Sequence, residues 1–595
     1  GLNRSLPVPA TPQRVAVISA AGAAGYGDFV NQLSANPQGY VVYPMLFPAV
    51  MQGERTVPTV MAALDWVERF RDMFDCVVII RGGGATTDLN ELLEVQLPEN
   101  VTVVIETGGA AEWQNDQVDA SKLQRWVYTS DGLELVDEQD TIPPYPSYYN
   151  SSYFDEIYHA RTGYEHLHGI KPYETTHPPL GKLMMSVGIA IFGMTPFGWR
   201  FAGALIGVLM LPALYLLAMQ LTHKRSIAVL SMAAFALDLM HYTRIATIDS
   251  FPVFFILLSY LFMVRYMQTD VFETVAGQAP RLFDKPFRKS LIPLLLSGIF
   301  MGLGIASKWI GIYSAAGLAV LFFITIYRQY RVSNVACGLS AGENGRPEQE
   351  EARLLCAQTL TLKRILITCG FCVIFFILIP CVIYYLCYIP YLLPTGPVTL
   401  KRVISAQQSM LDYHSTPGLG MDHFFQSPWW QWPFILKAMW FACDSYEPAG
   451  YASTIMCMGN PWVFYIGAVA MLGVLFACAA KYVRVRERVM LKQGDGDLTL
   501  LVLTIGFLAQ YLPWMLVPRS MYIYHYFASV PFIILSTAWW LDRIPKSRPK
   551  WRYGVMIAYL IGAAIFFVMF FPYASGWLTS INWLNALKWF PGLYY

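Results

Sequence analysis

Long apolar runs separated by short polar connections fill the chain from residue 199 onward. The hydrocarbon core of a bilayer needs roughly 20 helical residues, and interfacial aromatic residues can extend a shorter run. Ten runs meet this description: 199–221, 226–242, 249–267, 291–306, 309–327, 365–390, 461–480, 498–517, 520–541 and 553–573. The run 180–193 is shorter and predicts an interfacial or half-inserted helix. The pattern predicts a polytopic α-helical membrane protein with about ten spans.

Residues 1–140 contain no run of that length and follow another pattern. The β-branched runs 14–20, 76–80 and 101–105 predict strands, and the spacing of 59–70 predicts a helix between them. The turn RGGG at 81–84 follows one strand and could hold an anion. Without a full phosphate motif we favour a simple strand-to-helix turn. We expect a small α/β soluble segment here.

Positive charges gather in every second connection between the apolar runs. They lie within 224–225, 281–289, 328–364, 481–492 and 543–552. The positive-inside rule assigns these connections to the cytoplasm. The other connections, including 150–198, 243–248, 307–308, 391–460 and 518–519, are then extracytoplasmic. The net charge of +2 gives no indication of nucleic-acid binding.

The ten cysteines show no spacing typical of a metal site. Cys443 and Cys457 share the large outer loop, and we expect both to remain free thiols. No group of carboxylates resembles a metal cage, which favours a metal-independent reaction and leaves a divalent metal as the open alternative.

An acidic pair lies directly before the membrane part. Asp155 and Glu156, in the motif YFDE at 153–156, are followed by HPPLGK at 177–182. Ionisable groups at a membrane boundary are costly unless they are used. Adjacent residues of a helix point about 100° apart, so we do not expect both carboxylates to reach one proton. The alternative is an acidic pair that stabilises the start of a solvated helix.

Basic side chains near the same predicted surface are candidates for binding a phosphate. Lys182 follows two prolines that fix an extended backbone, while Arg244, Lys308 and Arg519 lie at outer ends of spans. Arg519 is the strongest candidate, because its planar guanidinium can bind a phosphate through two hydrogen bonds. Snorkelling of Lys182, and an Arg244–Asp249 pair that only closes a loop, are the alternatives. Otherwise Arg244 is a candidate either for binding the donor phosphate or for pairing with the acids, and Asp249 could support either role.

Other polar side chains are candidates for substrate contacts. His177 precedes the prolines, Gln408 and His414 lie in the large outer loop, and His525 and Tyr526 lie inside the ninth run. An intramembrane histidine is a functional candidate, although a helix-to-helix hydrogen bond is its commoner use.

From about residue 140 to its end the chain resembles the protein O-mannosyltransferase family of polyprenyl-phosphate-sugar-dependent membrane glycosyltransferases. Seven blocks carry the resemblance in order: SYFDEIYHARTGYEHLHG, THPPLGK, YTRIATIDSF, GIASKWIGIY, ISAQQSMLDYH, FQSPWWQWP and VPRSMYIYHYF. The resemblance implies a GT-C-like fold and places the catalytic carboxylate at Asp155. We divide this part into an outer catalytic loop (141–198), membrane helices (199–390), a large outer loop (391–460) and further helices with an outer tail (461–595).

The resemblance implies an inverting glycosyltransferase that moves a sugar, expected to be mannose, from a polyprenyl-phosphate donor to Ser/Thr hydroxyls of a protein or peptide on the extracytoplasmic face. Asp155 takes the proton, and Arg519, with Lys182 or Arg244, holds the leaving phosphate. Expected partners are the lipid-linked donor, the acceptor and membrane lipid, with no cofactor and no nucleic acid. A lipid or cell-wall glycan acceptor is one alternative. A transporter is another, disfavoured because ionisable groups gather at the outer ends.

The front segment resembles other families. Residues 1–90 (GLNRSLPVPATPQRVAVIS, LFPAVMQGE, VVIIRGGGATTDL) resemble the core of the exodeoxyribonuclease VII large subunit, and 88–139 (ENVTVVIETGGAAEWQ, KLQRWVY) resemble a clostripain-like cysteine peptidase. Neither piece retains a complete active site, so we interpret 1–140 as a mosaic segment with neither activity. It stands where the O-mannosyltransferase family usually carries a first span, which leaves open whether activity is intact.

Overall fold

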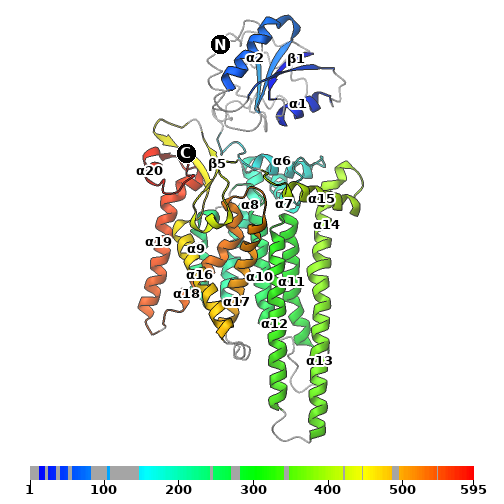
Figure 1. The fold of residues 1–595 in the computed structure, drawn as a ribbon, viewed down its shortest axis with the longest axis vertical. Helices are drawn as coiled ribbons and strands as arrows, with labels where there is room; N and C mark the ends of the chain where they lie inside the picture. The colour runs from blue at the N-terminus through cyan, green and yellow to red at the C-terminus, as the bar shows by residue number, and fades with distance from the viewer. Residues whose placement is uncertain are drawn as a thin grey trace. The chain divides into compact units, whose positions relative to one another are not determined.

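The computed structural model describes residues 13–20, 24–34, 41–50, 56–81, 103–107, 147–241, 245–269, 282–340, 347–419, 423–444, 447–484, 495–545 and 547–594. Its contacts divide the chain into two compact units, Gly1–Ser147 and Tyr148–Tyr595. Figure 1 labels the main elements of both units.

The first unit contains a parallel sheet in the order β2-β1-β3-β4. Its elements are β1 (Arg14–Ser19), α1 (Ala24–Ser34), β2 (Tyr43–Pro48), α2 (Thr56–Arg69), η2 (Arg71–Met73), β3 (Cys76–Arg81) and β4 (Val103–Thr107). The strands are apolar on both faces: Ile18 and Ile79 pack in the cluster that contains α2, and Val17 and Val78 pack on the other side. Such two-sided burial is typical of parallel sheets, and the predicted α/β fold is confirmed. The glycines of the RGGG turn lie outside the described residues.

The second unit is helical, and in its described part eight helices are long and apolar enough to cross a membrane. These spans are contributed by α8 (Pro196–Thr222), α10 (Ser250–Met267), α11 (Lys285–Ser307), α12 (Gly311–Ser340), the continuous rod of α13 (Pro347–Val373), η6 (Ile374–Leu378) and α14 (Ile379–Leu392), α16 (Pro461–Arg484), α17 (Asp495–Tyr511) and α19 (Pro549–Ser575). Each coincides with one of the ten predicted runs.

The other two predicted runs do not form single long helices. The run 226–242 becomes α9 (Arg225–Ala236) and the 3-10 turn η5 (Leu239–His241), and 520–541 becomes η10 (Ile523–Ser529) and α18 (Val530–Asp542). All seven residues of η10 except Tyr524 are buried inside the protein. An apolar run therefore predicts that residues avoid water, but it does not distinguish residues that face lipid from residues that are buried inside the protein, as most of η10 is.

Short elements gather at one end of the helical unit, which we call the loop end (Figure 1). They are α6 (Glu156–Leu167), α7 (Leu180–Phe192), η7 (Leu393–Thr395), α15 (Leu400–Ser415), η8 (Trp429–Phe434), the hairpin of β5 (Met439–Cys443) and β7 (Thr454–Cys457), β6 (Tyr451–Ala452), η9 (Leu512–Leu516), β8 (Thr579–Ser580) and α20 (Ile581–Ala586). The predicted short helix 180–193 is thus α7. Cys443 and Cys457 are free thiols, as expected.

Ion pairs stabilise the opposite end, where the basic connections lie. Asp542 binds both Lys224 at 2.7 Å and Arg552 at 2.6 Å, which joins the ends of α8, α18 and α19. Arg364 pairs with Asp284 at 2.5 Å between α13 and the start of α11. The basic connections and the acidic loop therefore lie at opposite ends of the helices.

Two glycines of α11 allow the rod of η6 and α14 to approach closely. A methyl group at Gly298 would collide with the carbonyl oxygen of Phe375, and one at Gly302 would lie 2.9 Å from Cα of Pro380. Small residues one turn apart are a common means of packing membrane helices. We call this contact the α11–α14 seam.

Candidate active site

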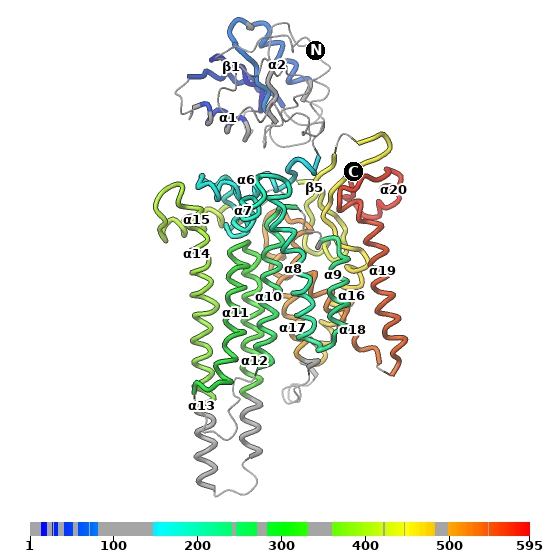
Figure 2. The backbone as a smooth tube through the Cα atoms, turned by 180° about the vertical axis from the view of Figure 1, so that it is seen from behind, coloured from blue at the N-terminus to red at the C-terminus, as the bar shows by residue number. Residues whose placement is uncertain are grey.

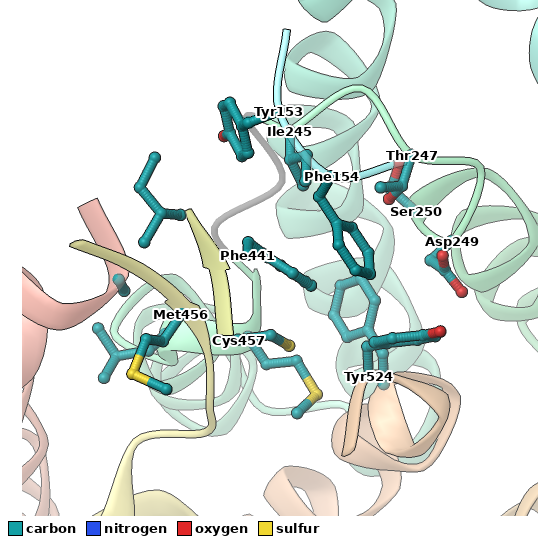
Figure 3. A pocket seen from close by; sticks show the side chains of 15 residues that line it. Tyr153, Phe154, Ile245, Thr247, Asp249, Ser250, Phe441, Met456, Cys457 and Tyr524 are labelled. Atoms are coloured by element: carbon teal, nitrogen blue, oxygen red, sulfur yellow. The ribbon is translucent and has the colours of Figure 1, made fainter. Parts of the chain in front are cut away.

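A strained residue sets the direction of the acidic pair. Phe154 has a φ of 53°, in the left-handed region that large side chains rarely adopt. Its ring packs 4.5 Å from that of Phe441 on β5 and 6.4 Å from that of Tyr524 on η10 (Figure 3). Strained backbone of this kind persists where the surroundings enforce it, and it is common at functional sites. Asp155 follows as the N-cap of α6.

Glu156 is a fully buried, fully paired carboxylate. Its two oxygens accept hydrogen bonds from Arg200 at 2.8 and 2.7 Å, from Nε1 of Trp199 at 3.3 Å and from the backbone N–H of Ala246 at 2.8 Å. Glu156 thereby ties α6 to α8 and to the loop before α10. This geometry supports a positioning role and leaves no free oxygen for a substrate. Arg200 is not among the residues predicted from the sequence, because its only signal is a charge near the start of an apolar run.

Asp155, in contrast, makes no side-chain hydrogen bond to its own helix, and its side chain is only partly buried. Burial raises its pKa to about 7, the negative charges of Asp249 and Glu174 add to this effect, and the positive charge of Lys308 opposes it. A carboxylate with a pKa near neutrality is suited to act as a general base.

Asp249 and Lys308 come together as predicted for this surface, but they bind each other. Nζ of Lys308 lies 2.6 Å from Oδ1 of Asp249 and 5.6 Å from the centre of the Tyr524 ring. Arg244, the other predicted partner of Asp249, lies outside the described residues.

A small cavity of about 60 Å³ lies beside the acidic loop, and Figure 3 shows its walls. Phe154, Thr247, Asp249, Cys457 and Tyr524 are among its lining residues. Tyr524 lies within electrostatic reach of Asp155, Asp249 and Arg519. We find no hydrogen bond to its hydroxyl in the described part of the chain. Tyr524 is not among the residues predicted from the sequence, whereas its neighbours His525 and Tyr526 are.

Lys182 does not face a lipid phosphate, and this prediction is wrong. The side chain is 0% exposed and forms an ion pair with the carboxylate of Glu174. It also donates to the carbonyl oxygens of Glu174, at 3.2 Å, and His177, at 3.0 Å. Burying an ammonium group requires such partners, and no pattern in the sequence indicates that Glu174 supplies them.

His177 belongs to the same buried group. Its Nδ1 lies 3.1 Å from Oε1 of Glu174. Burial lowers the pKa of His177 to about 4, although Glu174 opposes the shift. The imidazole is therefore neutral at physiological pH, and from the loop before α7 it contacts Glu174 and His414. Its predicted substrate contact stays a prediction.

His414 reaches this loop from α15, whereas Gln408 does not. Nε2 of His414 lies 2.7 Å from the carbonyl oxygen of Thr176, and its ring lies 5.2 Å from that of His177. Gln408 is exposed on another face of α15, and its predicted substrate contact stays a prediction. Its neighbour Gln407 faces inward and accepts a hydrogen bond from Tyr384 at 2.5 Å.

His525 and Tyr526 form part of the aromatic packing behind Tyr524. The ring of His525 lies 4.4 Å from that of Trp514 and 4.5 Å from that of Tyr524, and its Nδ1 contacts the backbone of Tyr522. Tyr526 is 1% exposed, and its ring lies 5.5 Å from that of Tyr511. The side chains of His525 and Tyr526 pack against aromatic neighbours and do not line the cavity.

Arg519 lines a second, larger pocket of about 410 Å³ together with Gln426, Ser427, Gln431 and Lys437. Backbone hydrogen bonds hold its loop, including one of 2.8 Å from Ser427 N–H to the oxygen of Met521. We find no ion pair of Arg519 among the described residues. Arg519 also lies close to His414 of α15. Burial lowers the pKa of His414 to about 4, and the positive charge of Arg519 adds to this effect.

Among the described residues, no group of three or more His, Cys, Asp or Glu side chains is arranged to hold a metal ion. At the loop end the described residues thus bring together the open carboxylate of Asp155, the Asp249–Lys308 ion pair and the guanidinium of Arg519.

Comparison with known families divides the chain in the same two parts. Residues 191–392 match the family described as dolichyl-phosphate-mannose-protein mannosyltransferase, and 399–593 match the C-terminal four TMM region of protein-O-mannosyltransferase. Residues 2–104 match the exonuclease VII large subunit, slightly beyond the predicted limit of 90. The resemblance of residues 88–139 to a cysteine peptidase stays a prediction.

Individual relatives agree with these matches. The polyprenol-phosphate-mannose–protein mannosyltransferase of Mycobacterium tuberculosis is 23% identical over 492 residues, covering 74% of this chain and 86% of the relative. That of Mycolicibacterium smegmatis is 25% identical over 494 residues, covering 74% and 87%. An exodeoxyribonuclease 7 large subunit of Cyanothece is 36% identical over 86 residues, which are 14% of this chain and 20% of that protein.

The fold is also found in a solved structure, the S. cerevisiae protein O-mannosyltransferase Pmt1-Pmt2 complex bound to the sugar donor. The TM-score is 0.56 at 13% identity, and the match covers 75% of this chain and 90% of that chain. The predicted GT-C fold is thereby confirmed. Because two matches to one family together span residues 191–392 and 399–593, the membrane part of this chain belongs to the protein O-mannosyltransferase family.

Proposed function

We propose that the membrane part transfers mannose from a polyprenyl-phosphate donor to a Ser or Thr hydroxyl of a protein or peptide. The proposal rests above all on Asp155, an open carboxylate with a pKa of about 7 at the position where the resemblance to the family places the catalytic carboxylate. The names of the mycobacterial relatives, which specify polyprenol-phosphate-mannose as donor and protein as acceptor, support the choice of substrates.

In the proposed reaction Asp155 accepts the proton of the acceptor hydroxyl while the oxygen attacks the anomeric carbon. The bond between that carbon and the phosphate oxygen breaks, and polyprenyl phosphate leaves with the bonding electrons. Attack from the face opposite the leaving group inverts the configuration. Glu156 and Arg200 hold the start of α6 so that Asp155 keeps its direction.

The leaving phosphate is held by Arg519. Its pocket also contains Lys437 and the amide and hydroxyl groups of Gln426, Gln431 and Ser427, which can donate hydrogen bonds to phosphate or sugar oxygens. Lys308 contributes its charge from beside Asp249. Cations that are already in place stabilise a leaving phosphate without reorganisation, so we propose that the reaction requires no metal.

The site faces the extracytoplasmic side in this proposal. Lys224, Arg364 and Arg552 lie at the end of the helices opposite Asp155, and the positive-inside rule assigns such basic connections to the cytoplasm. The enzyme would therefore be a multi-pass membrane protein whose donor is used in the outer leaflet.

The direct test is transfer in membranes that contain the full chain. Labelled polyprenyl-phosphate-mannose and a Ser/Thr-rich peptide are added, and label in the peptide is measured with and without EDTA. We expect transfer in both conditions with the native chain, none with Asp155→Asn, and donor binding by both. Label found only in lipid or glycan would replace the protein acceptor by one of those alternatives, and native turnover in Asp155→Asn would refute the base.

A further inference from the structure

A stripe of exposed apolar side chains runs along α15. Leu400, Ile404 and Leu411 are 63%, 57% and 56% exposed. At 100° per residue these three side chains point within about 40° of one another. We call them the α15 stripe. Three large aliphatic side chains on one line of a helix are costly in water, because each would gain about 1.5–3 kcal/mol on full burial.

The rest of the helix has a definite order around the stripe. On one flank Val403 and Met410 are buried and pack with Tyr388 and Leu392 of α14. On the other flank the side chains are polar and exposed: Lys401, Ser405, Gln408, Ser409 and Asp412. The stripe therefore lies between the protein-facing side and the solvent-facing side, which is the arrangement of a helix that lies flat in a membrane surface.

The level of α15 agrees with that arrangement. The apolar rod Leu360–Thr395 ends only five residues before Leu400. Four tyrosines, at positions 384, 385, 388 and 391, lie in the cluster that joins this end of the rod to α15. Tyrosines concentrate at the headgroup level of membranes. Exposed apolar side chains of the rod continue up to Leu393, which is 63% exposed. Figure 2 shows α15 lying across the end of α14.

We propose that α15 is an interfacial helix whose stripe is inserted into the boundary between headgroups and acyl chains of the adjacent leaflet. The partner is thus a lipid surface, and the large loop 391–460 begins as part of the membrane interface. Because His414 of the same helix contacts the carbonyl oxygen of Thr176, the lipid surface also supports the loop that carries His177.

A fluorescence experiment on the full chain in phospholipid vesicles tests this contact. Ile404→Cys and Leu411→Cys place a thiol on the stripe, and Ser405→Cys and Ser409→Cys are matched controls on the polar face. Each variant is labelled with the dye NBD, and the native chain, which carries its own cysteines, gives the background to subtract. The quencher is a phospholipid with a nitroxide near the top of one acyl chain.

We expect the quenching constant at positions 404 and 411 to exceed that at 405 and 409 by about twofold or more, because only the stripe reaches the acyl boundary. Equal quenching at all four positions, whether strong or weak, would overturn the proposal. Labelled thiols at exposed positions leave the buried face of α15 intact, so folding is preserved. The readout needs no sugar transfer, so this proposal can fail independently of the proposed function.

Discussion

The raised pKa of Asp155 predicts how transfer should depend on pH. A general base works only when it is deprotonated, and a carboxylate with a pKa of about 7 loses its proton between roughly pH 6 and pH 8. The deprotonated fraction is about 9% at pH 6 and about 91% at pH 8, so kcat/KM should rise about tenfold over this interval. An ordinary aspartate, with a pKa near 3.8, would give a flat profile there.

Part of the rise in the pKa of Asp155 comes from the charge of Asp249, so a substitution at Asp249 should change that pKa. Asp249→Asn removes a negative charge that raises the pKa of Asp155, and it frees Lys308, whose charge lowers that pKa. Both effects shift the rising limb of the profile to lower pH. Asp412→Asn, at an exposed position of α15, is the matched control and should leave the limb in place.

The assay is the initial rate of label transfer to peptide at subsaturating donor, measured from pH 5 to pH 9 in the same vesicles. A profile that is flat over this range in the native chain, or a limb that Asp249→Asn does not move, would refute the assignment of Asp155 as a base of raised pKa.

Three further predictions concern stability and donor binding. The pKa of Asp155 is raised by about three units from 3.8, which corresponds to at most about 4 kcal/mol, reduced by its partial solvent access. This cost appears only when the group is charged, so Asp155→Asn should raise the Tm at pH 8 and leave it unchanged at pH 3, below the unfolded-state pKa of 3.8. Arg200→Met leaves the buried Glu156 charged and without its ion-pair partner, and the loss of about 3–5 kcal/mol should appear as a lower Tm. Arg288→Met, at an exposed position of α11, is the control and should change the Tm little. Arg519→Lys keeps the charge but loses the planar fork, so the donor KM should rise about tenfold with the Tm unchanged, and an unaltered KM would exclude Arg519 from the phosphate site.

Much of the arrangement could be predicted because alternating topology brings sequence-distant loops to the same surface. Asp155, Asp249, Lys308 and Arg519 lie at the loop end for that reason. Pairings inside the site could not be predicted, because they depend on direction. Nothing in the sequence shows that Lys182 turns inward to Glu174.

Which face of a helix points inward could not be predicted from the sequence either. Gln407 and Gln408 are adjacent and chemically identical, and only the docking of α15 on α14 decides that Gln407 faces inward. In the same way the motif around Arg519 indicated aromatic and imidazole candidates, yet the 3-10 geometry of η10 turns Tyr524, rather than His525 or Tyr526, toward the cavity. Hydropathy also counted η10 as part of a span, since residues buried in protein and residues facing lipid have the same composition.

The α11–α14 seam has a mechanical consequence for the outer surface. Gly298 of α11 packs against the rod of η6 and α14 at Phe375, and the far end of that rod continues through η7 into α15, which carries His414. A methyl group at Gly298 would push the rod away from α11, and η7 and α15 would move with the rod. The displacement would be larger at α15 than at the α11–α14 seam, because α15 lies at the far end of the rod. A methyl group at Gly298, far from the reaction centre, would thus shift the contact of His414 with Thr176, next to the segment His177-Pro178-Pro179. Every reacting group would remain chemically unchanged.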